Sequence, residues 1–184
     1  MWLFVLLIAF IQHRQAKVFI TENNGKPLTL SMLATGYSLF SLTSFCIGVN
    51  LPYLVLLNAF LPMFFLDISN CWLPLGFTNA FWAAGIMTTF LPGALTTPVM
   101  AIVSSGSVFI VLTILHHTLS KRYKEPLGRG DIHLMAALFA YLPAQSALTC
   151  LGSALLLMAC VMVKHRPQPF APYLFAVLCF FSLT

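Results

Sequence analysis

Apolar stretches alternate with short polar ones along the whole chain. The apolar segments cover about residues 1–11, 31–48, 51–66, 77–95, 98–118, 132–146, 147–163 and 172–184. A helix needs about 20 apolar residues, with a range of about 17–25, to cross a bilayer core of about 30 Å. Most of these segments come near that length, although the first and the last are short. The pattern predicts an all-α polytopic membrane protein, a bundle of about eight transmembrane helices with six as the lower limit.

Prolines support several of the segment boundaries. Pro52, Pro92, Pro98 and Pro143 fall at or near predicted helix ends, where a missing N–H group is tolerated. Pro62 falls inside its segment and predicts a kink there. We expect residues 1–184 to form one membrane-embedded domain, in which residues 12–30 are a short cytoplasmic loop.

The composition excludes an ordinary soluble domain. The chain is 60% hydrophobic and 7% charged, with a mean hydropathy of +0.94, whereas soluble domains carry about 25% charged residues. The net charge of +5 could suggest nucleic-acid binding, but the basic residues are spread thinly between apolar segments and fit membrane anchoring better. The five cysteines include no C-x-x-C pair and no histidine at zinc-finger spacing, so the sequence predicts neither a metal nor a cofactor.

The charged residues fall in alternate predicted loops. Loops on one face carry, in order, Arg14, Lys17, Glu22 and Lys26; Asp67; Lys121, Arg122, Lys124, Glu125, Arg129 and Asp131; and Lys164 and Arg166. Alternate loops share one face of a membrane, and the positive-inside rule makes a basic face cytoplasmic. The first apolar run precedes the first basic residues, which predicts a retained first helix with its N-terminus outside. Both aspartates are therefore expected on the cytoplasmic side.

Asp67 and Asp131 are the only aspartates in the chain, and each borders a long apolar segment. Asp67 could be an ordinary helix-end carboxylate in the headgroup region, although its own loop holds no basic partner. Asp131 closes the sequence Gly-Arg-Gly-Asp at residues 128–131 and is expected to be the N-cap of the next helix. Two carboxylates brought close together share a proton, so that one acts as a base and the other as an acid toward water.

Three short motifs near the aspartates resemble those of the type IV prepilin peptidases, which are membrane aspartic proteases. Residues 73–78 read Leu-Pro-Leu-Gly-Phe-Thr, with Pro74 seven residues after Asp67, where the family has Leu-Pro-x-x-Leu-Thr. Residues 128–137 read Gly-Arg-Gly-Asp-Ile-His-Leu-Met-Ala-Ala, where the family has Gly-x-Gly-Asp-x-Lys-Leu-x-Ala-Ala. Residues 169–174 read Pro-Phe-Ala-Pro-Tyr-Leu, where the family has Pro-Phe-Gly-Pro-Tyr-Leu.

The resemblance implies an aspartic endopeptidase of the bacterial inner membrane that faces the cytoplasm. Its substrate would be a type IV prepilin or a type II secretion pseudopilin, cut between the basic leader and the hydrophobic segment. The resemblance implies that the catalytic pair is Asp67 and Asp131, without a metal or cofactor. The supporting residues would be Gly128, Gly130, Pro74 and His133.

Several positions depart from the family pattern. His133 replaces a lysine, Phe77 a leucine and Ala171 a glycine, while Phe139 and Pro143 stand where the family tends to have glycines. His133 could tune Asp131 or could serve at the membrane interface. Residues 12–30 lack the cysteine-rich domain that many members carry there, so we expect peptidase activity without N-methylation.

Two other classes of function remain open from the residues. A non-catalytic scaffold of pilus or secretion assembly would tolerate neutralisation of either aspartate. A small proton-coupled transporter would keep its carboxylates at mid-membrane depth, whereas both aspartates here border their apolar segments. Apart from membrane lipid and the substrate, the sequence predicts no partner and leaves the oligomeric state open.

Overall fold

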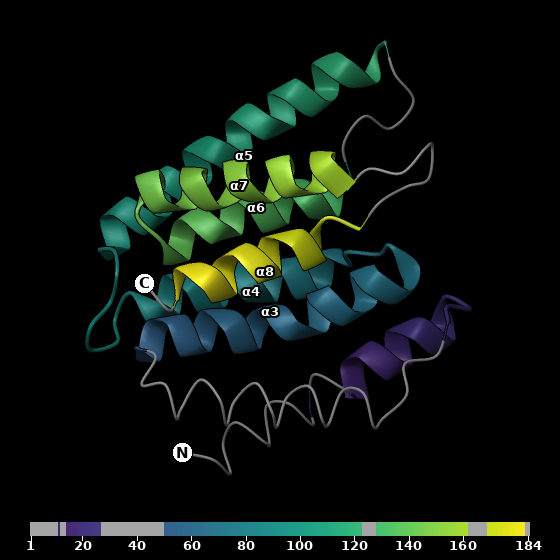
Figure 1. Cartoon of the computed structure of the whole chain (residues 1–184), viewed down its shortest axis with the longest axis horizontal. Helices are drawn as coiled ribbons and strands as arrows, with labels where there is room; N and C mark the ends of the chain where they lie inside the picture. Colours follow the sequence, from purple (N-terminus) through teal and green to yellow (C-terminus); the bar gives the residue numbers. More distant parts are fainter. Residues whose placement is uncertain (1–10, 12–13, 27–49, 123–127, 162–168, 183–184) are drawn as a thin grey trace.

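The computed structural model of the protein describes residues 11, 14–26, 50–122, 128–161 and 169–182. Within these ranges every regular element is a helix (Figure 1). Residues 14–22 form a short helix, and the longer ones are α3 (Leu51–Asn70), α4 (Leu75–Thr88), α5 (Pro98–Ser120), α6 (Arg129–Tyr141), α7 (Ala144–Val161) and α8 (Ala171–Phe181). The predicted all-α class is confirmed for the described part of the chain.

The prediction of about eight transmembrane helices is not borne out. Among the described helices, α3, α5 and α7 are long and apolar enough to cross a membrane. The other three labelled helices, α4, α6 and α8, have 14, 13 and 11 residues, which at 1.5 Å per residue is about 20 Å or less. The predicted segments 1–11 and 31–48 lie outside the described residues, apart from residue 11.

Two predicted segments, 77–95 and 132–146, are longer than the helices that form there. Helix α4 ends at Thr88, where the hydroxyls of Thr88 and Thr89 each donate to a backbone carbonyl three residues earlier, both at 2.6 Å. Such local side-chain bonds compete with helix continuation. Helix α6 ends because Leu142 is extended, with φ −113° and ψ 149°, as expected for a residue that precedes proline. Apolarity alone therefore overestimated both lengths.

Three prolines lie at helix boundaries, as predicted. Pro52 lies in the first turn of α3 and Pro98 begins α5, and Pro143 separates α6 from α7. Pro62 lies inside α3, which continues through it from Leu51 to Asn70.

Within the segment predicted as a short loop, residues 12–30, the structure forms a helix at residues 14–22. The apolar side chains of Ala16 and Ile20 are buried in a small cluster with Leu66, and Phe77 packs against that cluster. This contact holds the short helix against the ends of α3 and α4.

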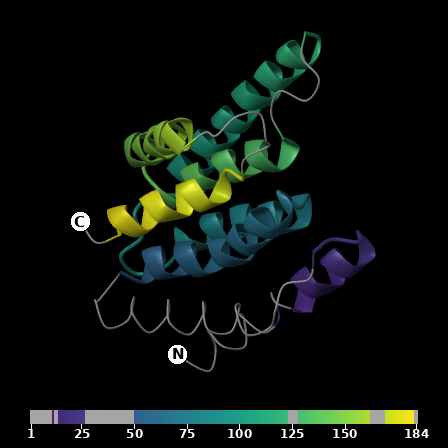
Figure 2. The ribbon, with the colours of Figure 1, turned by 45° about the vertical axis from the view of Figure 1, so that its right-hand side comes forward.

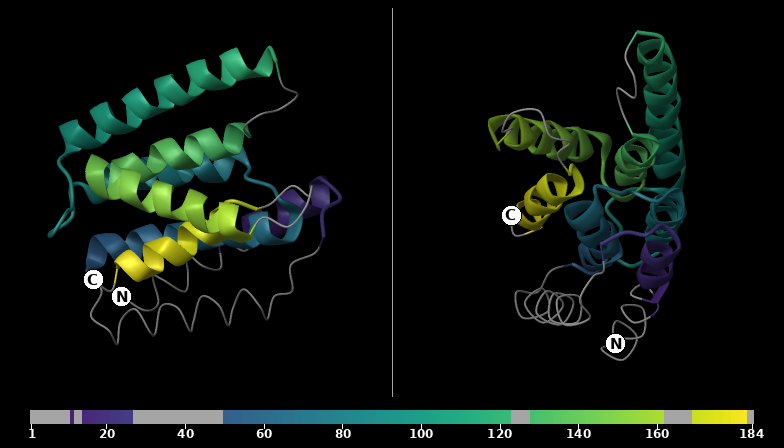
Figure 3. Two further views of the ribbon diagram at one scale, coloured as in Figure 1. Left: turned by 45° about the horizontal axis from the view of Figure 1, so that its top comes forward. Right: turned by 90° about the vertical axis from the view of Figure 1, so that its right-hand side faces the viewer.

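Helix α6 is the centre of the bundle. Ten of its thirteen residues are buried, and its most extensive contacts are with α4 and α5. On the other side, α8 packs against both α3 and α7 (Figure 3). Aromatic rings pack between α3, α4 and α6. Phe81 of α4 lies edge-on to Phe60 of α3 and stacks on Tyr141 of α6, with centroid distances of 5.6 and 4.7 Å.

Helix α5 lies on the outside of the bundle (Figure 2). Only Ala101 and Ser105 of this helix are buried, and its remaining surface is strongly apolar. The exposed large side chains include Val99, Met100, Ile102, Val103, Ile110, Val111, Ile114 and Leu115. An apolar surface of this kind, on a helix long enough to span, suits contact with lipid tails.

The labelled helices alternate in direction, so the charged residues of the described ranges gather at one end of the bundle (Figure 1). This end, the charged end below, holds the C-terminal ends of α3, α5 and α7 and the N-terminal ends of α4, α6 and α8. The placement agrees with the alternation that the sequence predicted.

Candidate functional site

A cavity of about 710 Å³ at the charged end brings the two aspartates together. Its lining comes from the helix at 14–22, the end of α3 and the chain that follows it, the start of α6, and the residue before α8. The lining residues are Phe19, Asn23, Asp67, Cys71, Trp72, Leu73, Pro74, Gly128, Gly130, Asp131 and Phe170. Five of the six site residues predicted from the sequence therefore line one cavity, which we call the dyad cavity.

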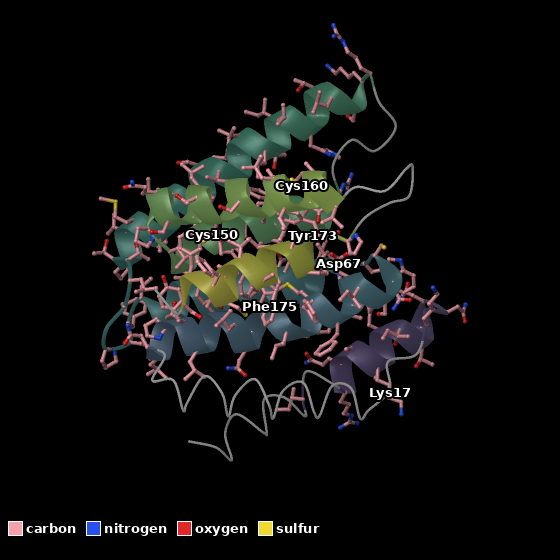
Figure 4. All side chains as sticks on the ribbon, viewed as in Figure 1. Lys17, Asp67, Cys150, Cys160, Tyr173 and Phe175 are labelled. Atoms are coloured by element: carbon pink, nitrogen blue, oxygen red, sulfur yellow. The ribbon has the colours of Figure 1, made fainter. Side chains whose placement is uncertain are left out.

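Asp67 lies in the last turn of α3 and is held by the start of α8 (Figure 4). Its side chain is only 4% exposed, so it does not fit an exposed headgroup position. One carboxylate oxygen, Oδ2, accepts the backbone N–H of Ala171 at 2.7 Å, and the backbone of Phe170 also hydrogen-bonds the carboxylate. The first N–H groups of a helix have no partner within the helix, and the positive end of its dipole favours an anion.

The motif at residues 169–174 provides the backbone N–H groups that bind the Asp67 carboxylate. The sequence showed where the motif lies, but nothing in it indicated that its backbone would bind Asp67. Pro172 has no N–H to offer, so the donors are the two residues before it. Ala171 is fully buried, and its methyl group replaces the family's glycine without removing the donated N–H.

Asp131 lies in the first turn of α6 but is not its N-cap. The cap is Gly128, with φ −64° and ψ 140°, so the sequence-based prediction is wrong by three residues. The Asp131 carboxylate reaches back and is hydrogen-bonded by the backbone of Gly128, as the acidic residue of a capping box does. Burial disfavours the charged form and raises the pKa of Asp131 to about 6, against the lowering effect of this hydrogen bond.

The two glycines of the Gly-Arg-Gly-Asp sequence serve different contacts. A Cβ atom at Gly128 would lie 2.7 Å from Oδ2 of Asp131, so this glycine leaves room for the carboxylate. A Cβ atom at Gly130 would overlap the backbone carbonyl oxygen of Leu73, so this glycine lets the chain after α3 pack directly on α6. Both glycines are needed for close approach rather than for a positive φ.

The chain between α3 and α4 turns sharply beside Asp67. Cys71 adopts a left-handed conformation with φ 52°, and its N–H donates to the carbonyl of Asp67 at 2.8 Å. Three residues later, Pro74 is the N-cap of α4. The turn thus places Pro74 on the wall of the dyad cavity.

Residues 19–26, which are the end of the short helix and the chain after it, pack against one side of the turn at residues 71–74. Phe19 lies edge-on to Trp72 with a centroid distance of 6.0 Å. The side-chain oxygen of Asn70 accepts the backbone N–H of Lys26 at 2.7 Å, and its nitrogen donates to the carbonyl of Lys26 at 3.4 Å. Neither a motif nor a charge marks Phe19, Asn70 or Trp72 in the sequence, so their place at the site could not be predicted.

His133 does not line the dyad cavity. Its Nδ1 lies 2.7 Å from Oδ1 of Asn79, and its ring lies 4.9 Å from that of Phe109. Trp82 also faces this ring and donates its indole N–H to Ser105 at 3.0 Å. His133 therefore belongs to the packing between α4, α5 and α6, although it is only two residues from Asp131.

The two carboxylates are close enough for the charge of Asp131 to act on Asp67. A pair that cannot easily carry two negative charges holds one proton between its members. Such a pair can take a proton from water with one carboxylate and give a proton to a leaving group with the other. Within the described ranges, no three His, Cys, Asp or Glu side chains are grouped to hold a metal ion.

The chain was compared with protein families, curated proteins and solved structures, without a match. No protein-family model matches the chain, and neither a curated protein nor a solved structure does so. The geometry of the site and the motifs around it are therefore the basis of the functional conclusion.

Proposed function

We propose that the protein is a membrane aspartic endopeptidase in which Asp67 and Asp131 form the catalytic pair. The observation that carries this proposal is the dyad cavity, which is lined by both aspartates of the chain although they are on different helices. The cavity also borders the three motifs that resemble those of the type IV prepilin peptidases. We therefore propose a prepilin or pseudopilin precursor as the substrate, cleaved at the cytoplasmic face of the inner membrane.

The chemistry follows from what holds each carboxylate. The start of α8 fixes Oδ2 of Asp67 and holds the carboxylate in place beside the cavity. Burial raises the pKa of Asp131 to about 6, so the pair can keep one proton between its members and donate it to the nitrogen of the departing peptide. The ionised member of the pair removes a proton from the attacking water, and the protonated member supplies one to the amine, so the pair returns to one shared proton after release.

The direct test is co-expression of a candidate prepilin with the wild type, Asp67→Asn and Asp131→Asn, followed by a gel shift for the leader. Each substitution is expected to lower processing by about 10²–10⁴-fold, because each removes one half of the acid–base pair. Membrane levels of the three proteins serve as the control for folding. Normal processing by either variant would rule out Asp67 and Asp131 as the catalytic pair.

The transporter hypothesis receives less support from the geometry. Both carboxylates lie at the charged end of the bundle, within a turn of the end of α3 and of the start of α6. A proton path would require titratable groups at intermediate depth. N-methylation of the product forms no part of the proposal.

A further inference from the structure

A second cavity of about 1090 Å³ lies beside the dyad cavity. It runs between the helix at 14–22 and the beginnings of α4 and α6. Its lining is mostly apolar and consists of Ile11, Arg14, Gln15, Val18, Phe19, Glu22, Leu73, Pro74, Leu75, Gly76, Phe77, Ala80, Arg129 and Gly130. We call it the apolar groove.

The apolar groove and the dyad cavity are neighbours on either side of Gly130. Phe19, Leu73, Pro74 and Gly130 line both of them. Along α6, Arg129 lines only the groove and Asp131 only the dyad cavity. A polypeptide whose peptide bond lies at the two carboxylates therefore has the groove next to it, across the contact between Leu73 and Gly130.

The dyad cavity and the apolar groove are lined by different charges, and this difference determines in which direction a substrate chain lies across them. The dyad cavity contains both aspartates and no basic side chain among its lining residues. The groove contains two arginines, Arg14 and Arg129, and a single acidic residue, Glu22. A basic leader is attracted by the carboxylates and repelled by the arginines, whereas an apolar segment gains free energy by leaving water for the groove.

We propose that the apolar groove binds the first apolar residues on the C-terminal side of the scissile bond, and that the basic leader extends away from it past the dyad cavity. This assignment rests on the proposed peptidase function. It makes the helix at 14–22 one wall of the substrate site, because Val18 and Phe19 face the groove from that helix. The substrate then crosses the site in one direction only.

Gly76 allows the groove to be filled without disturbing the protein. It is the second residue of α4 and lines the groove, and a Cβ atom built there meets no other atom within 4 Å. Gly76→Leu should therefore occupy substrate space rather than clash with the fold. Gly152→Leu is the matched control, since Gly152 is a helical glycine of α7 with the same open surroundings and lines neither cavity.

The experiment measures cleavage of three prepilin substrates by the full-length protein in lipid nanodiscs. One substrate is unmodified, one has serines in place of the first apolar residues after the scissile bond, and one has serines in place of the leader's basic residues. For the unmodified substrate, Gly76→Leu is expected to raise KM by about tenfold to a hundredfold, the equivalent of losing the burial of one apolar side chain. The kcat should stay near that of the wild type, and Gly152→Leu should change neither constant.

The modified substrates decide which side of the bond occupies the groove. The rise in KM caused by Gly76→Leu should largely disappear with the substrate that has serines after the scissile bond. It should persist with the substrate that has serines in place of the leader's basic residues. A rise that disappears with this leader substrate instead, or no rise with the unmodified substrate, overturns the groove assignment.

The same assay separates the assignment from the proposed function. If the wild type cleaves, Asp131→Asn does not, and Gly76→Leu behaves as the wild type, only the groove assignment fails. If the wild type cleaves none of the substrates, or if Asp131→Asn still cleaves, the proposed peptidase function fails and the assignment fails with it.

Discussion

The carboxylate of Asp131 is positioned by the absence of a side chain at Gly128. A methyl group there would lie 2.7 Å from Oδ2, and the carboxylate would have to move. The backbone of Gly128 has φ −64°, which alanine adopts without strain. Gly128→Ala should therefore alter the site while leaving the fold intact.

For Gly128→Ala we expect kcat for prepilin cleavage to fall by about tenfold to a hundredfold, since a misplacement of about 1 Å can cost about 100-fold. Thermal unfolding in detergent should change little. Gly152→Ala, at an open position on α7, is the control. A wild-type kcat for Gly128→Ala would show that Asp131 does not need its present position.

The raised pKa of Asp131 also predicts how stability depends on pH. In the folded protein this carboxyl keeps its proton up to a pH of about 6, whereas in the unfolded chain it ionises near pH 4. The folded state therefore binds more protons in this range, and stability falls as pH rises from about 4 through 6.

We expect the Tm of the wild type to decrease between pH 4.5 and 7.5, and Asp131→Asn to show a smaller decrease. At the higher pH the Asn variant should be at least as stable as the wild type, because it no longer buries an ionised group. Differential scanning fluorimetry at the two pH values measures both effects. Equal pH dependence in the two proteins would contradict a buried, protonated Asp131.

At the scale of elements, the chain between α3 and α4 is held directly against α6 at Gly130. The obstacle to any side chain at this position is the carbonyl oxygen and Cβ of Leu73. Backbone cannot rotate away as a flexible side chain can. Substitution of Gly130 should therefore destabilise the fold, whereas substitution of Gly128 should alter the site and leave the fold intact.

Gly130→Ala is expected to lower the free energy of unfolding by about 1–3 kcal/mol, the usual cost of forcing extra volume into a packed contact. It should also lower activity, because the displaced segment carries Pro74 of the cavity wall. Thermal unfolding compared with Gly128→Ala and Gly152→Ala is the measurement. The idea fails if Gly130→Ala unfolds at the same temperature as those two.

Sequence patterns could predict the elements only where the responsible signal is local. Pro98 and Pro143 lie at helix boundaries because proline acts on its immediate neighbours. The ends of α4 and α6 were missed because threonine hydroxyls and an extended Leu142 end them within apolar sequence. Hydropathy does not distinguish a residue that continues a helix from one that ends it.

At the scale of the whole molecule, the bundle has one charged end and one without charges in the described ranges. Charge alone predicted this arrangement, since basic residues in alternate loops require helices that alternate in direction. The contact between Asp67 and Ala171 could not be predicted in this way. It joins a side chain to a backbone N–H 104 residues away, and no property of either residue in the sequence indicates the partner.

The orientation in the membrane is directly testable at two exposed positions, Arg122 after α5 and Gln145 in the first turn of α7. The C-terminal end of α5 and the N-terminal end of α7 lie at opposite ends of the bundle (Figure 1). In a chain whose native cysteines are replaced by alanine, a membrane-impermeant maleimide applied to spheroplasts should label Gln145→Cys but not Arg122→Cys. The positive-inside rule makes this prediction, and lysed cells, where both should react, provide the control. Labelling of Arg122→Cys in intact spheroplasts would reverse the proposed orientation.

The binding of Asp67 by the start of α8 has a consequence for how the protein is made. Ribosomes deliver both aspartates to the membrane well before residues 170 and 171, whose N–H groups orient one of them. During that interval the nascent chain contains both carboxylates but not the helix start that holds Asp67. Under the proposed function, proteolytic competence is acquired only once α8 has docked beside α3, which would protect the unfinished chain and its membrane neighbours from premature cleavage.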